Sequence, residues 1–187
     1  HSEQSEEAPS AAGGNEASAP EAKAELAQTL ADETALYEHI YAMCQNANKT
    51  LIFANQRAAV EKIVTNLRAL AARNNTPDYY HVHHGSISRE LREGAENAMR
   101  DPARPATVAA TLTLELGIDI GKLDQVLQVN ATHSVSSFVQ RLGRSGRRGT
   151  PSQMFFYCQE DAPDDATSLA EMIPWNLLQT IAIIQLY

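Results

Sequence analysis

One short stretch, QRLGRSGRRG from Gln140 to Gly149, gathers arginine and glycine residues that together could bind phosphate. Guanidinium groups are permanently charged and present forked donors that match phosphate oxygens. Arg144 and Arg147 are three residues apart, so on a helical turn both side chains can point the same way. The alternative is a solvated basic face or a general nucleic-acid patch. Such a patch does not need glycine at every third position, whereas a close approach to another surface does.

A second group of residues with possible chemistry follows the apolar run 106–111, at the point where a strand would end. Glu115, Gly117 and Asp119 lie there, before the next apolar run. The Gly-Ile-Asp unit has a simple interpretation as a turn. Alternatively, a carboxylate at this position grips a ribose hydroxyl or an arginine. The sequence leaves these alternatives open.

A third group is the histidine-rich stretch HVHHGSISRE, which begins at His81. His81 and His83 alternate along a predicted strand, which places them on one face. Three histidines raise the possibility of a metal site, but no cysteine or carboxylate joins them with ligand spacing, and we assign no metal. The alternative is that Gly85 and Ser86 open a helix whose free N–H groups bind an anion such as a nucleic-acid phosphate.

A fourth group consists of the polar residues Asn55, Gln56 and Arg57, directly after the apolar run TLIFA. Polar residues at this position can simply cap the helix that follows. They are equally well placed to contact a ligand at the edge of a sheet, because ligands of open parallel sheets bind outside the carboxyl ends of the strands.

The charge of the chain is unevenly distributed. The 187 residues carry a formal net charge of −8 from 23 acidic and 15 basic residues. Nine of the acids and one base fall within residues 1–38, so the remainder holds 14 of each. An acidic total therefore does not exclude nucleic acid, which needs only a local basic surface.

Composition also excludes some classes of protein. No apolar run approaches 18 residues, so we expect no membrane span and no membrane partner. The acidic, polar start is unlike a signal peptide. Cys44 and Cys158 are far apart and lack metal-ligand spacing, which favours free thiols in a reducing compartment. We expect a cytoplasmic protein.

Strand and helix patterns alternate along the chain, which predicts an α/β fold with a doubly wound parallel sheet flanked by helices. Short apolar runs predict strands at 50–54, 79–83, 106–111, 125–130 and 153–158, and periodic apolar positions predict helices between them. Ser88 is the expected N-cap of one such helix.

The chain divides into four parts. Residues 1–20 form an acidic low-complexity segment that we expect to be disordered, and 21–48 a leading helical segment. Residues 49–160 form the α/β domain, and 161–187 a helical extension. The extension is apolar on nearly every side, so it either packs as a core helix on the sheet or forms a junction to a following domain.

Taken in their order along the chain, from Asn55 to Gly149, the four groups resemble motifs IV, IVa, V and VI of the superfamily 2 helicases (the DEAD/DEAH type), in the second RecA-like domain. The stretches HHGSISRELRE, LELGIDIG and QRLGRSGRRG are most similar to the large helicase-related (Lhr) group of DNA helicases. The resemblance covers about Leu51 to Cys158. It implies a RecA-like helicase C-terminal domain.

The resemblance also implies roles on the nucleotide side. ATP, with Mg²⁺, would lie between two RecA-like domains and be bound mainly by the first. Arg144 and Arg147 would be arginine fingers that stabilise charge during phosphoryl transfer. Gln140 and Arg141 would couple to the acidic motif of the first domain. Asp119, with Gly117, would reach the nucleotide's sugar.

On the nucleic-acid side, the resemblance assigns Thr111 to a phosphate contact. Gly85 and Ser86, with Asn55 and Arg57, would follow the backbone of the strand. The sequence departs from the family pattern at Leu112-Thr113, where relatives tend to carry small or hydroxyl residues, and this puts the local backbone contact in doubt.

Two family features are missing from the sequence. It contains no G-x-x-x-x-G-K-[ST] loop to hold phosphates and no D-E-x-H or D-E-A-D run. We therefore expect a fragment: the second motor domain of an ATP-dependent helicase, inactive without the first RecA-like domain of the same protein. Single-stranded DNA is the expected partner and RNA the alternative. A catalytically silent RecA-like module that binds nucleic acid or a protein is a further alternative.

Overall fold

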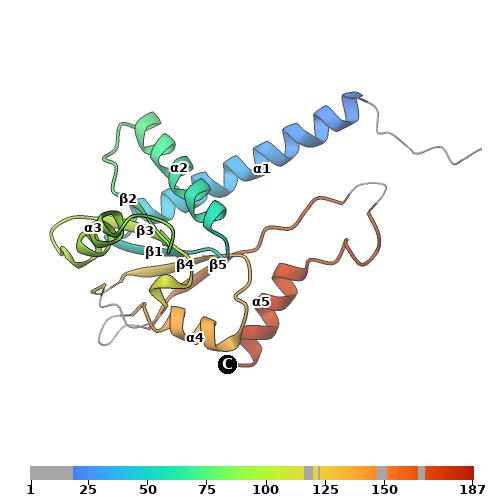
Figure 1. The fold of residues 1–187 in the computed structure, drawn as a ribbon. Helices are drawn as coiled ribbons and strands as arrows, with labels where there is room; N and C mark the ends of the chain where they lie inside the picture. Colours follow the sequence, from blue (N-terminus) through green and yellow to red (C-terminus); the bar gives the residue numbers. More distant parts are fainter. Residues whose placement is uncertain (1–18, 116–119, 122, 147–150, 164–166) are drawn as a thin grey trace, which may run out of the picture.

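In the computed structural model, five parallel strands form one sheet in the order β2-β3-β1-β4-β5 (Figure 1). The structure describes residues 19–115, 120–121, 123–146, 151–163 and 167–187. The strands are β1 (Lys49–Phe53), β2 (Tyr80–His83), β3 (Ala106–Ala110), β4 (Gln125–Val129) and β5 (Met154–Tyr157). Each predicted strand is present, and the predicted doubly wound parallel sheet is confirmed. The predicted disordered segment 1–20 lies outside the described residues except for its last two.

Helices connect the strands and cover both faces of the sheet. They are α1 (Ala19–Gln45), α2 (Arg57–Arg73), α3 (Arg89–Arg100), α4 (Val135–Leu142) and α5 (Trp175–Gln185), and a 3₁₀ turn, η1, spans Leu112–Leu114. Helices α1 and α2 lie on one side of the sheet, and α4 and α5 on the other (Figure 1). Ser88 caps α3 as predicted, because its side chain accepts a hydrogen bond from the amide of Leu91.

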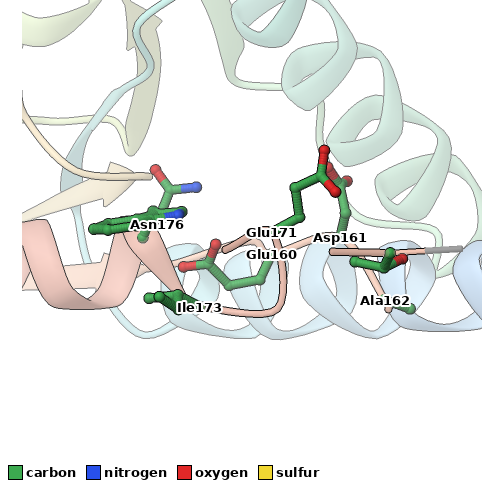
Figure 2. Close-up of a pocket in the computed structure, with 8 residues that line it drawn as sticks. Glu160, Asp161, Ala162, Glu171, Ile173 and Asn176 are labelled. Carbon is green, nitrogen blue, oxygen red and sulfur yellow. The ribbon is translucent and has the colours of Figure 1, made fainter. Parts of the chain in front are cut away.

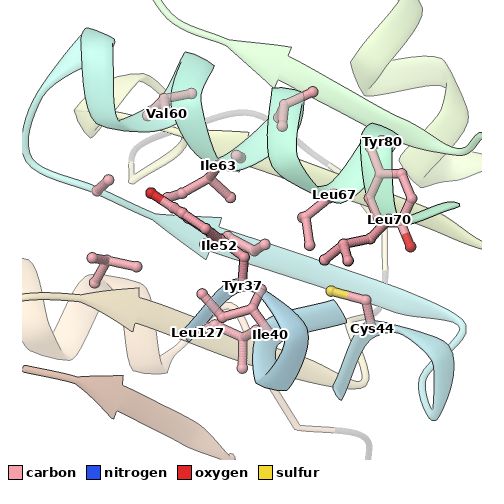
Figure 3. Close-up of a cluster of buried hydrophobic side chains, with 14 of the residues drawn as sticks. Tyr37, Ile40, Cys44, Ile52, Val60, Ile63, Leu67, Leu70, Tyr80 and Leu127 are labelled. Atoms are coloured by element: carbon pink, nitrogen blue, oxygen red, sulfur yellow. The ribbon is translucent and has the colours of Figure 1, made fainter. Parts of the chain in front are cut away.

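The core is divided into two clusters by the sheet. Strands β1, β3 and β4 are buried along their whole length, and most of their positions are apolar. Ile52 points into the cluster formed with α1 and α2, where it meets Ile40 and Ile63 (Figure 3). Leu51 and Phe53 point to the opposite face, because successive side chains of a strand alternate.

A buried lysine joins the sheet to the connection between α3 and β3. The ammonium of Lys49 donates to the carbonyl oxygens of Ala98 and Arg104, each at 2.7 Å, and the residue is 4% exposed. Burial lowers the pKa of Lys49. The two carbonyls replace the water that the ammonium loses, so the charge can be accommodated inside.

The C-terminal helix packs on only one side. Thr180 and Ile183 are buried, and Tyr187 meets Phe138 of α4 with ring centroids 5.4 Å apart. The other apolar side chains of the helix stay more than two-fifths exposed: Trp175, Leu177, Leu178, Ile181 and Ile184. Of the two alternatives for this extension, packing on the domain is therefore seen for one face of the helix only. Within the described residues, no helix has the length and apolarity to cross a membrane.

Candidate nucleic-acid and nucleotide interface

The register of the sheet brings three strand ends to one level. Phe53 lies opposite Ala110, and Ala110 lies opposite His83, so β1, β3 and β2 end side by side. The residues that follow these ends line one open hollow of about 780 Å³, which is within the usual size of ligand clefts. Its lining includes all five residues assigned to nucleic acid: Asn55, Arg57, Gly85, Ser86 and Thr111. We call this hollow the strand-end groove.

Side chains in the strand-end groove are oriented by their neighbours. Arg57 donates from Nη1 to the hydroxyl of Ser86, which ties the start of α2 to the turn after β2. Asn55 donates from Nδ2 to the carbonyl of Ala131 at 2.8 Å. Gln56 is the N-cap of α2 but makes no side-chain capping bond, so the simple capping alternative is not realised. Polar groups are thus held at the groove by contacts other than helix capping.

Two positions in the groove are open to a ligand. A Cβ placed on Gly85 would meet no atom within 4 Å, so nothing in the described chain fills the space above it. Thr111 makes a backbone bond to the carbonyl of His83, and its hydroxyl has no hydrogen-bond partner among the described residues. An unpaired hydroxyl and a bare backbone are both suited to a phosphate oxygen.

The histidines are engaged by protein groups. His83 pairs through Nδ1 with the hydroxyl of Thr113 at 2.8 Å and through Nε2 with Glu96 at 3.2 Å. His84 pairs through Nε2 with Glu61 at 2.9 Å. Burial, followed by the nearby charge of Arg68, lowers the pKa of His81. Among the described residues no group of three or more potential metal ligands comes together.

Arg141 forms a buried ion pair with Glu115. Its Nε donates to Oε1 of Glu115 at 2.6 Å, its Nη1 donates to Oε1 of Gln128, and the guanidinium carbon lies 4.7 Å from the ring centroid of Phe53. The arginine is 0% exposed, and burial lowers its pKa while Glu115 opposes that shift. A carboxylate after β3 was expected to bind either a ribose hydroxyl or an arginine, and Glu115 binds an arginine.

This burial bears on the role predicted for Arg141 and Gln140, which is coupling to the acidic motif of another domain. The guanidinium of Arg141 is bound by Glu115 and Gln128 of its own domain, whereas Gln140 is exposed on α4. The coupling stays a prediction for both residues. The role of Gln128 was missed by sequence reasoning. The one signal was a glutamine within the strand QVLQV, where a buried strand otherwise carries apolar residues.

Arg144 contacts the same glutamate as Arg141 does. Its Nη2 donates to the backbone carbonyl of Glu115 at 2.6 Å, and the side chain is partly exposed. Glu115 therefore holds Arg141 with its carboxylate and Arg144 with its carbonyl. The other nucleotide-side residues, Arg147, Gly117 and Asp119, lie outside the described residues.

Gly146 explains one of the regularly spaced glycines. Its φ is +99°, and a Cβ there would lie 2.8 Å from the hydroxyl oxygen of Ser152. A side chain is excluded both by the backbone conformation and by this close approach. The spacing of glycine in the arginine stretch therefore has a structural basis at this position.

A second hollow lies between β5 and α5 and differs in charge. Its lining includes Glu160, Asp161 and Glu171, with Ile173 and Asn176 nearby (Figure 2). Three carboxylates repel a phosphate backbone. Of these two hollows, the strand-end groove, with Arg57 and open backbone, is better suited to an anionic ligand.

Comparison with known proteins decides the family. Residues 32–149 match the helicase conserved C-terminal domain. The chain belongs to this family. As a helicase C-terminal domain it has the RecA-like fold of superfamily 2, and its sequence is similar to those of Lhr helicases. The resemblance found in the motifs is thereby confirmed.

The similarity of this helicase domain to Lhr proteins extends over about three-fifths of the chain. It is 38% identical over 114 residues to the ATP-dependent helicase Lhr-Core of Methanothermobacter thermautotrophicus, which covers 61% of this chain and 13% of that protein. The helicase Lhr of Mycobacterium smegmatis, solved with ssDNA and AMP-PNP, matches with 38% identity and a TM-score of 0.59. That match covers 65% of this chain and 16% of the other.

A further structural relative is the DUF1998 helicase MrfA bound to DNA. It shares 28% identity and a TM-score of 0.58 with this domain, over 66% of this chain and 17% of the other. The helicase domain therefore spans a small part of the length of each of these relatives.

Proposed function

We propose that this domain is the second motor domain of an ATP-dependent DNA helicase. The observation that carries the proposal is the convergence of three strand ends on one groove, joined by η1 to the residue that holds Arg144. In this proposal the motor unit is residues 49–160, with 21–48 and 161–187 as flanking helical segments. Turnover requires a first RecA-like domain from the same protein.

On the nucleic-acid side, the strand-end groove binds the backbone of single-stranded DNA. Arg57 supplies charge, the Thr111 hydroxyl supplies a donor, and Gly85 supplies a backbone amide next to the Ser86 hydroxyl. Contacts of this kind position a strand without reading its sequence. The Lhr and MrfA structures, solved with ssDNA and with DNA, support DNA as the partner.

On the nucleotide side, Arg144 and Arg147 act as arginine fingers across a cleft between two domains. Gln140 couples the domains, and Gly117 with Asp119 reaches the sugar. ATP with Mg²⁺ is bound mainly by the first domain, since this sequence lacks a phosphate-holding loop. The similarity to the ATP-dependent helicase Lhr-Core supports ATP as the nucleotide.

The test joins this domain to its native upstream domain and measures DNA-stimulated ATP hydrolysis. We expect Arg144→Ala to lower kcat by about a thousandfold, because a finger stabilises charge that develops in the transition state. Binding of ATP should be largely spared. The matched control is Arg73→Ala, whose guanidinium is exposed and pairs with Glu38 at the far end of α2. Equal turnover in the two variants would refute the finger assignment, and stimulation by RNA in place of DNA would refute the DNA assignment.

A further inference from the structure

The buried imidazole of His84 stands between helix α2 and the turn that lines the strand-end groove. His84 directly follows β2 and is 2% exposed. Its Nε2 lies 2.9 Å from Oε1 of Glu61, and its Nδ1 lies 3.3 Å from the amide nitrogen of Ser86. Both ring nitrogens are therefore engaged, each by a group of a different segment.

These two contacts fix the position of the proton on the ring. A backbone amide only donates hydrogen bonds, so Nδ1 must be the acceptor and carries no proton. The proton of the neutral ring is then on Nε2, where it is donated to the carboxylate of Glu61. A carboxylate that orients an imidazole through one nitrogen sets the function of the other.

Two side chains hold Ser86 of the Gly85–Ser86 turn. His84 Nδ1 accepts from its amide, and Arg57 donates to its hydroxyl. Both are connected to α2, because Arg57 and Glu61 are one helical turn apart on it. Nothing among the described atoms fills the space next to Gly85. The two side-chain bonds add to the backbone bond that closes the turn, from the Ile87 amide to the His84 carbonyl at 3.3 Å.

The other titratable groups nearby make separate contacts. Arg68 and His81 line another hollow that Glu61 borders. On the opposite side of β2, His83 is bound to Glu96 and Thr113 and does not reach this turn.

We propose that His84, oriented by Glu61, is a positioning residue that holds the amide of Ser86 and thereby sets the shape of the strand-end groove. The effect on nucleic acid rests on the function proposed above, whereas the support of the turn does not. His84 touches no ligand in this proposal and acts through the Ser86 amide.

The chain offers a matched pair of variants at this position. In His84→Asn, the side-chain oxygen can take the place of Nδ1, so the acceptor for Ser86 is kept and the contact to Glu61 is lost. In His84→Gln, the longer amide can take the place of Nε2, so the contact to Glu61 is kept and the acceptor for Ser86 is lost. A role in packing alone would make the two variants equivalent.

The first measurement needs no nucleic acid. In the unmodified chain at pH 8, ¹⁵N NMR of the His84 ring should show the tautomer protonated at Nε2, and the Ser86 amide should be protected from hydrogen exchange. Protection should survive in His84→Asn and be lost in His84→Gln. A ring protonated at Nδ1, or equal protection in the two variants, would overturn the proposal.

The second measurement is binding of fluorescently labelled oligo-dT, followed by anisotropy at low salt. At pH 8 we expect His84→Gln to bind about fivefold more weakly than His84→Asn, the effect of one amide hydrogen bond. Equal binding by His84→Gln and His84→Asn would overturn the proposal. If oligo-dT does not bind the unmodified chain at pH 8, the groove assignment fails, and the NMR result alone decides the role of His84.

Discussion

The carboxylate of Glu115 lies 2.6 Å from the Nε of Arg141, inside the domain, whereas Arg144 nearby is partly exposed. The same glutamate accepts a hydrogen bond from Arg144 through its backbone carbonyl. One residue thus connects a guanidinium that is enclosed with one that can reach a ligand. Because the position of Glu115 depends on Arg141, the stability of the domain and the placement of Arg144 are linked.

Glu115→Gln should therefore destabilise the domain strongly. The change leaves the buried charge of Arg141 without its counter-ion, which costs about 3–5 kcal/mol of unfolding free energy. Urea denaturation followed by circular dichroism measures this. The control is Glu33→Gln, which breaks an exposed ion pair with Lys62 and should cost less than about 1 kcal/mol. Similar losses in the two variants would show that Arg141 does not depend on Glu115.

Arg57→Ala should weaken binding of single-stranded DNA to the chain about fivefold and make it less sensitive to salt. Loss of one phosphate contact lowers the slope of log affinity against log salt concentration by about 1. Fluorescence anisotropy over a series of salt concentrations gives both quantities. The exposed Arg73, at the other end of the same helix, supplies the control variant Arg73→Ala. A slope unchanged from that of the unmodified chain would exclude Arg57 from the phosphate path.

Two glycine-to-alanine changes should act in opposite directions. Gly146→Ala meets a φ of +99° and a hydroxyl 2.8 Å from the new Cβ, so it should destabilise by about 1–3 kcal/mol. Gly94→Ala lies within α3, where a Cβ meets nothing within 4 Å, and should stabilise by about 0.5–1 kcal/mol. Thermal unfolding of both variants tests this, and a common sign would contradict it.

The stability of the fold should fall on mild acidification, in part through His81. Burial lowers the pKa of this imidazole in the folded chain. Below the ordinary histidine pKa of about 6.5, the unfolded chain therefore binds a proton that the folded chain does not, and unfolding is favoured. This contribution is complete above that pKa and is lost as the pH falls toward the folded value.

His81→Asn removes this contribution, so its free energy of unfolding should decline less than that of the unmodified chain between pH 7.5 and pH 5.5. Urea titrations at several pH values provide the measurement. His133→Asn, at an exposed position, accounts for the general effect of removing an imidazole. If the unmodified chain and His81→Asn lose stability in parallel, the burial of His81 has no energetic consequence.

Hydrophobic pattern was sufficient to predict the sheet, because three of its strands are buried on both faces and are apolar at most of their positions. The same logic placed the groove residues, since the carboxyl ends of parallel strands meet at one edge. Asn55 and Thr111, which are 56 positions apart in the chain, needed only this rule to be brought together.

The part that escaped prediction is the interior of the arginine stretch. Nothing local distinguishes Arg141 from Arg144, as the two arginines are three residues apart in the same stretch. What separates them is Gln128 and Phe53 on neighbouring strands, which together with Glu115 form a polar site inside the core. Burial of that kind depends on contacts between distant segments, which periodicity along one segment does not report.

The consecutive histidines at the end of β2 have a mechanical consequence. His83 is tied to α3 through Glu96, and His84 is tied to α2 through Glu61, so this edge strand is fastened to the layers above and below it. The opposite edge, β5, has no fully buried residue. Under a pulling force the sheet should peel from β5, leaving the three strands that form the groove as the last part to come apart.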